Sequence, residues 1–169
     1  NSQETLKSMV SFEGNNDNLD FSLSSEVYND LNKSKESDKY EFVLPNFTIA
    51  KNFKTNLNGS LSMSNTGYNK LYQTNINERI LINNLIYESM DSINTLGLIN
   101  NYKIFIKNFN SDSKNSTEYK NNTENNLQGL LQFNSSYPLK KNGNRYDSTL
   151  TPILNVKINP KSNKNIQNF

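Results

Sequence analysis

The fold is decided by the stretch Leu19-Asp20-Phe21-Ser22-Leu23-Ser24, in which apolar and polar side chains alternate without a break. The alternation extends to residue 28, with Glu26 on the polar side and Val27 on the apolar side. Successive side chains of an extended chain point to opposite faces of a sheet. The stretch therefore predicts a β-strand with one apolar and one polar face.

The same period of two recurs along the chain. It is found in residues 5–13, 57–64, 72–82, 98–109, 127–134 and 150–158. In residues 40–49 the phase of the alternation reverses after Pro45, which suggests a bulge, a sheet edge or a turn between strands. Helical spacing is sustained nowhere, although residues 79–89 also fit a short helix.

Polar stretches separate the predicted strands. Residues 29–38, 112–126 and 140–148 read as loops, and Tyr119 is the one apolar side chain in the second of them. Residues 65–67 (Asn-Thr-Gly) and 142–144 (Asn-Gly-Asn) read as turns. The pattern predicts an all-β chain, an antiparallel up-and-down meander of about eight to ten strands. Two architectures fit: a soluble β-sandwich, and part of a large transmembrane β-barrel.

Composition excludes several classes of function. Only 33% of the residues are hydrophobic, and the chain contains no His, Cys or Trp, which excludes Cys/His zinc sites, histidine bases and thiol nucleophiles within it. Eighteen basic residues balance sixteen acidic ones, which argues against a nucleic-acid partner. The acidic residues Glu13, Asp17 and Asp20 lack the spacing of a calcium loop. We therefore predict no enzyme, and no catalytic, cofactor-binding or metal-binding residue.

Five segments resemble a known family when they are taken in order along the chain. They are residues 39–47 (KYEFVLPNF), 75–84 (NINERILINN), 97–102 (GLINNY), 135–141 (SSYPLKK) and 150–160 (LTPILNVKINP). Together they resemble the barrel of the LPS-assembly protein LptD family, also called the organic-solvent-tolerance protein OstA. Because the chain is far shorter than such a barrel, residues 1–169 are expected to be an internal fragment of it, with no second domain.

The resemblance implies a place and a role. Proteins of this family lie in the outer membrane of Gram-negative bacteria, where the barrel inserts lipopolysaccharide (LPS) into the outer leaflet. The implied partners are LPS, an LptE-like lipoprotein plug, periplasmic Lpt bridge proteins and outer-membrane lipid. The alternatives are a segment of another outer-membrane barrel, such as a porin or a receptor, and a soluble β-rich surface module.

The alternation also predicts which side chains face lipid if the strands span a membrane. On one side of each strand the apolar residues would contact hydrocarbon. The candidates for this lipid-facing role are Leu19, Phe21, Leu23, Tyr40, Phe42 and Leu44. Glu78 and Arg79 are adjacent, so a regular strand would point them to opposite faces.

Overall fold

The computed structural model describes residues 4–73, 75–144 and 146–160. These residues are almost entirely in strands. The elements are β1 (Thr5–Asn16), β2 (Leu19–Asp30), α1 (Glu36–Lys39), β3 (Tyr40–Phe53), β4 (Gly59–Tyr72), β5 (Ile76–Ser89), β6 (Ser92–Ile93), β7 (Ile99–Lys114), β8 (Thr123–Ser136), β9 (Leu139–Lys141), β10 (Ser148–Leu150) and β11 (Ile153–Ile158).

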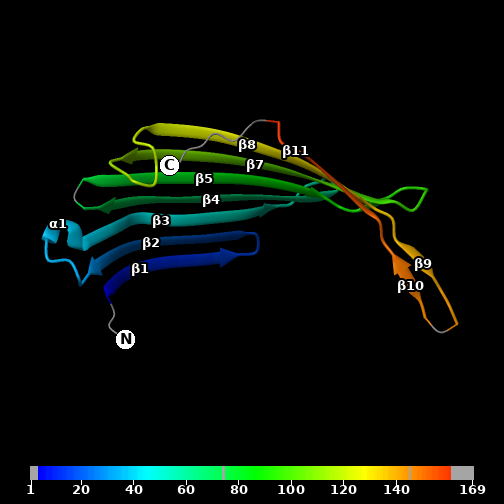
Figure 1. Ribbon diagram of the computed structural model, residues 1–169, viewed down its shortest axis with the longest axis horizontal. Helices are drawn as coiled ribbons and strands as arrows, with labels where there is room; N and C mark the ends of the chain where they lie inside the picture. The colour runs from blue at the N-terminus through cyan, green and yellow to red at the C-terminus, as the bar shows by residue number, and fades with distance from the viewer. Residues whose placement is uncertain (1–3, 74, 145, 161–169) are drawn as a thin grey trace.

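The long strands form one antiparallel sheet in the order β1-β2-β3-β4-β5-β7-β8-β11, and the short strand β6 pairs with β7. Strands β9 and β10 form a separate hairpin that projects from one end of the sheet (Figure 1). Nearly all neighbours in the sheet are consecutive in sequence. The prediction of an all-β, antiparallel up-and-down meander is therefore confirmed.

The phase reversal after Pro45 is a β-bulge inside one continuous strand. In the pairing of β3 with β4, Val43 lies opposite Lys70 and Asn46 lies opposite Tyr68, so two residues of β3 face one residue of β4. Proline has no N–H to donate to a neighbouring strand and is tolerated at a bulge. The extra residue keeps the apolar residues before and after Pro45 on the same face of the sheet.

Several local predictions were wrong. Residues 65–67 lie inside β4, and the turn falls after Tyr72, so residues 72–82 are not one strand. The alternative of a short helix in residues 79–89 is not adopted, because these residues belong to β5. The predicted loop 112–126 is shorter, because β7 continues to Lys114 and β8 starts at Thr123. Hydrogen bonds to neighbouring strands override the turn composition of residues 65–67 and the loop composition at both ends of residues 112–126, and a single sequence does not reveal such partners.

The sheet is a single layer with almost no core of its own. Among the described residues, the buried hydrophobic side chains are Ile76, Ile80 and Phe109. In the described ranges thirty large apolar residues are exposed, from Leu6 on β1 to Ile158 on β11. No helix of the described residues is long and apolar enough to cross a membrane. A sheet normally buries its apolar face against a second layer, so this exposed face requires an apolar environment outside the described chain.

Candidate functional site: the two faces of one sheet

The register of the sheet places the predicted lipid-facing residues on one face, which we call the apolar face. Phe21 lies opposite Ile49 and Leu23 lies opposite Phe47. Phe42 lies opposite Val27, and Leu44 follows Phe42 by two residues. Directly opposed residues point to the same side of a sheet. By the same rule, Leu19, opposite Lys51, and Tyr40, opposite Asn29, complete the set of six candidates on this face.

The apolar residues of this face form an oblique band, here called the apolar band. One hydrogen-bonded row carries Phe12, Leu23 and Phe47 on β1 to β3, and the same row carries Asn110 and Asn125 on β7 and β8. On β8 the band is instead centred near Leu131. Members of the band, taken from β1 to β11, include Val10, Phe12, Phe21, Leu23, Phe42, Phe47, Ile49, Leu61, Met63, Leu85, Ile104, Ile106, Leu131, Phe133 and Val156.

The inclination of the band follows from the register. The row that contains Leu23 on β2 contains Asn125 on β8, whereas the band on β8 is centred near Leu131. Between β2 and β8 the centre of the band therefore moves six residues, or about 20 Å, along the strands. Over the same interval, from β2 to β8, the sheet extends about 24 Å, at about 4.8 Å for each neighbouring strand. The band therefore makes an angle of roughly 40° with a line perpendicular to the strands, so strands crossing the band are tilted by the same amount. Strands of transmembrane barrels tilt by roughly 35–45°.

Two glycines let aromatic rings lie flat on the apolar face. A Cβ atom at Gly67 would be 2.7 Å from Cε1 of Phe47, which lies opposite it on β3. A Cβ atom at Gly14 would collide with Cε1 of Phe21, which lies opposite it on β2. Each ring therefore occupies the space above a glycine, and cross-strand packing of an aromatic residue on a glycine stabilises the pairing. This contact also explains why Phe21 is only half exposed.

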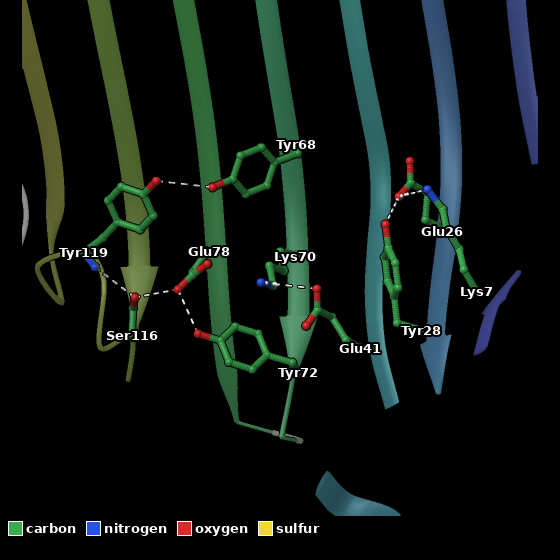
Figure 2. Close-up of polar contacts among 10 residues, drawn as sticks. All are labelled: Lys7, Glu26, Tyr28, Glu41, Tyr68, Lys70, Tyr72, Glu78, Ser116 and Tyr119. Carbon is green, nitrogen blue, oxygen red and sulfur yellow. Dashed lines mark hydrogen bonds and ion pairs between the residues drawn. The ribbon is translucent and has the colours of Figure 1, made fainter. Parts of the chain in front are cut away.

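The opposite face, here called the polar face, carries a line of charged and tyrosine side chains near one end of the strands (Figure 2). On β1 and β2, Lys7 lies 3.0 Å from a carboxylate oxygen of Glu26, and the Tyr28 hydroxyl donates to the same carboxylate at 2.5 Å. On β3 and β4, Lys70 pairs with Glu41 at 3.2 Å. Each of these two ion pairs joins neighbouring strands, β1 to β2 and β3 to β4, and so favours the register at this end.

Glu78 of β5 is the most deeply buried of these groups, with 1% of its surface exposed. The Tyr72 hydroxyl donates to its Oε1 at 2.9 Å, and the Ser116 hydroxyl donates to the same atom at 2.5 Å. Ser116 lies in the connection between β7 and β8, residues 115–122, which we call the β7–β8 loop. A buried carboxylate is costly unless hydrogen bonds satisfy it, so these two donors fasten the loop to the polar face.

The loop is also held by an aromatic contact. The ring of Tyr119 stacks on Phe109 with centroids 6.3 Å apart, and its hydroxyl lies 3.4 Å from that of Tyr68 (Figure 2). Burial raises the pKa of the Tyr119 hydroxyl. The Ser116 hydroxyl also accepts from the backbone N–H groups of Glu118 and Tyr119, which shapes the turn. The loop therefore packs on residues of β4, β5 and β7 on the polar face.

Sequence reasoning placed Glu78 and Arg79 on opposite faces, and the register agrees. Arg79 lies on the apolar face, 3.7 Å from Asp112, and both side chains are exposed. The roles of Ser116 and Tyr119 were missed, although Tyr119 stood out as the one apolar side chain in a polar run. In the described part of the chain, no group of three or more acidic residues could hold a metal ion.

The comparison with protein-family models finds no match, and neither does the comparison with curated proteins.

Proposed function

We propose that this chain is part of the wall of a transmembrane β-barrel, with the apolar face against lipid and the polar face toward the lumen. The observation that carries the proposal is the apolar band. Its residues are exposed or half-buried, it crosses the strands at roughly 40°, and on β7 it gives way to Asn108 and Asn110 toward one end. A membrane of fixed thickness crossing tilted strands imposes such a pattern.

Hydrocarbon accounts for this face better than a second protein layer. A sandwich needs a second sheet packed about 10 Å from this face, and the described residues form no such layer over it. Charged residues of the face lie mainly beside the band, as Arg79 and Asp112 do. Lys51 lies close to the margin, with its ammonium 5.4 Å from the ring centroid of Phe53. A long cationic side chain at such a margin can reach the membrane surface.

The edges of the sheet favour a segment of a larger barrel. Strand β1 pairs only with β2 among the described residues, and β11 covers only part of β8. An unpaired backbone group in hydrocarbon costs several kcal/mol, so membrane sheets close into barrels. We infer that strands outside residues 4–160 complete the wall.

The finer proposal is that this barrel is the outer-membrane component of the LPS-assembly translocon in a Gram-negative bacterium. It is supported by the ordered resemblance of residues 39–160 to that family. In this role the protein would move LPS into the outer leaflet together with a lipoprotein plug and periplasmic bridge proteins. The role needs no bond-making chemistry, in keeping with a chain that lacks His and Cys.

The membrane proposal is tested by spin labels on the intact protein that contains this chain, reconstituted in phospholipid bilayers. Labels at Leu19, Phe21 and Leu23 should relax faster with dissolved oxygen, which concentrates in hydrocarbon. Labels at Ser22 and Ser24 should respond to a water-soluble nickel complex. Protection of the three apolar sites from oxygen, or the reverse pattern, would contradict the assigned faces.

The transport proposal is tested by depleting the intact protein in its own host and measuring LPS at the cell surface. We expect surface LPS to fall and LPS to accumulate at inner sites. Unchanged surface LPS, together with altered uptake of small solutes, would refute the translocon role and favour a porin or a receptor.

A further inference from the structure

Two hydrogen-bonded asparagines lie within the apolar band. Asn65 of β4 and Asn83 of β5 are directly opposite in register, and Nδ2 of Asn65 donates to Oδ1 of Asn83 at 2.5 Å. We call these two residues the amide pair. On the side toward β3 the same row carries Ile49, which is exposed. Along β5 the exposed residues Leu81 and Leu85 lie on either side of the amide pair, so apolar residues enclose it on three sides.

The inclination of the band gives the depth of the amide pair in a membrane. The centre of the band moves six residues over the five steps from β2 to β8, or about 1.2 residues per step. The row that contains Leu23 contains Gly67 on β4 and Leu81 on β5. The centre therefore lies near Asn65 on β4, and about 1.6 residues, or about 4 Å of depth, from Asn83 on β5. Since the apolar zone is about 25 Å tall, both carboxamides face hydrocarbon if lipid covers them.

The amide pair has hydrogen-bonding groups that the row does not use. A carboxamide has two N–H donors and an oxygen with two lone pairs. Nδ2 of Asn83 donates to Oδ1 of Asn108 at 3.0 Å, so one N–H of Asn65 and one of Asn83 are used along the row. Among the described residues, no donor reaches Oδ1 of Asn65, and the second N–H of each carboxamide has no acceptor. Hydrocarbon offers no partner to these groups, and leaving them without one is costly.

A second copy of the protein supplies the missing partners at the right depth. A carboxamide is complementary to another carboxamide, because each both donates and accepts. Two copies of one membrane protein lie at the same depth and in the same orientation, so their amide pairs are level with each other. Inside a membrane, where apolar surfaces have little reason to leave lipid, hydrogen bonds between polar side chains contribute to association.

The charged residues of this face do not oppose such a contact. Arg79 and Asp112, farther along β5 and β7, are exposed and lie 3.7 Å apart, so their charges neutralise each other. By the same arithmetic they lie about 15 and 18 Å from the midplane, outside the apolar zone. Lys114, exposed at the end of β7, lies still farther out, where water solvates its charge.

We propose that two copies of the intact protein meet side by side in the membrane, with the amide pair of each copy at the centre of the contact. The two-fold axis runs along the membrane normal, because both copies have the same orientation in the bilayer. Each amide pair donates to and accepts from the other. This inference rests on the proposed membrane location, and it replaces lipid by a second copy only at this part of β4 and β5.

The first test measures the association of the intact protein in phosphatidylcholine bilayers by energy transfer between labelled copies at increasing dilution with lipid. We expect a dimer whose dissociation constant rises about 10-fold or more in the variant Asn65→Leu/Asn83→Leu, since each interfacial hydrogen bond is worth about 3- to 10-fold. Leucine is at home in hydrocarbon, so this variant should fold.

The matched control is Asn101→Leu/Asn134→Leu. It removes a pair of amides from the polar face, where Nδ2 of Asn134 donates to Oδ1 of Asn101 at 2.7 Å. This control should associate as strongly as the unaltered protein. An unaltered protein that is monomeric, or an equal loss of association in the two double variants, would overturn the inference.

Spin labels locate the contact without altering the amide pair. With one label per copy at Leu85, beside the axis, the distance between labels should be below about 20 Å, since facing sheets pack about 10 Å apart. Val10 lies four strands from β5, about 19 Å from the axis, so labels there should be about 40 Å apart or more. A long distance at Leu85 with a short one at Val10 would place the contact elsewhere and contradict the inference.

Oxygen access in the same bilayers separates this inference from the membrane proposal. If oxygen reaches a label at Leu23 and the protein is monomeric, the dimer inference alone fails. A monomer whose label at Leu85 is shielded from oxygen also refutes it, because another segment then covers the amide pair. If oxygen does not reach Leu23, the membrane location fails, and the dimer inference fails with it.

Discussion

Replacing Leu23 by arginine should destabilise the barrel strongly, and the cost should depend on position along β2. The apolar residues of β2 extend from Leu19 to Val27, with Leu23 midway between them. At about 3.4 Å per residue and a tilt of roughly 40°, four residues correspond to about 10 Å of depth. Since the apolar zone of such barrels is about 25 Å tall, Leu23 lies near the midplane and the other two lie near its margins.

The magnitudes follow from this placement. Arginine facing lipid at the midplane costs about 2–4 kcal/mol, and near the interfaces about 0–1 kcal/mol. We therefore expect Leu23→Arg to lower the free energy of unfolding by about 2–4 kcal/mol, and Leu19→Arg and Val27→Arg to lower it by about 1 kcal/mol or less. Ser22→Arg, on the polar face, should change it by about 0.5 kcal/mol or less.

The assay is equilibrium denaturant unfolding of the intact protein folded into phospholipid bilayers. The variants differ only in position, so the intrinsic effect of arginine cancels between them. If Leu23→Arg costs no more than Leu19→Arg, or if Ser22→Arg costs as much as Leu23→Arg, the depth assignment is refuted. A packed protein layer over the face would instead penalise all three apolar positions similarly.

Two further predictions concern the loop and a glycine. Glu78→Gln should weaken the hydrogen bonds from Tyr72 and Ser116 by about 1–2 kcal/mol, since bonds to a charged acceptor are about twice as strong as neutral ones. The β7–β8 loop should then detach more often, and tryptic cleavage after Lys120 should become about tenfold faster. Glu88→Gln, at the exposed end of the same strand, is the control, and equal cleavage of both variants would argue against the fastening role. Gly67→Ala should cost about 1–3 kcal/mol in denaturant unfolding because its Cβ would displace the Phe47 ring. Adding Phe47→Leu should recover part of this loss, and an unchanged stability of Gly67→Ala would refute the close packing.

Residues that act through their own strand were predictable. Alternation is a property of the extended backbone, so Leu19, Phe21 and Leu23 share a face whatever lies beside β2. The reversal after Pro45 was visible for the same reason, although a bulge, an edge and a turn all fitted it. Register with β4 distinguishes among these three.

Residues that act through distant partners were not predictable. Asn65 and Gly67 have the composition of a turn, yet Asn65 donates to the side chain of Asn83 on β5 and Gly67 lies under the ring of Phe47. Glu78 and Ser116 are 38 positions apart and meet only because the β7–β8 loop covers the polar face.

The sequence alone thus determined that this protein is built of strands with one apolar and one polar face, because the order of the side chains along each strand sets this pattern. The tertiary structure decided the tilt of the apolar band, the cross-strand hydrogen bonds between asparagine side chains and the attachment of the β7–β8 loop to the polar face. Each of these depends on the offset between neighbouring strands, which is set by the sum of many cross-strand contacts and by no single segment.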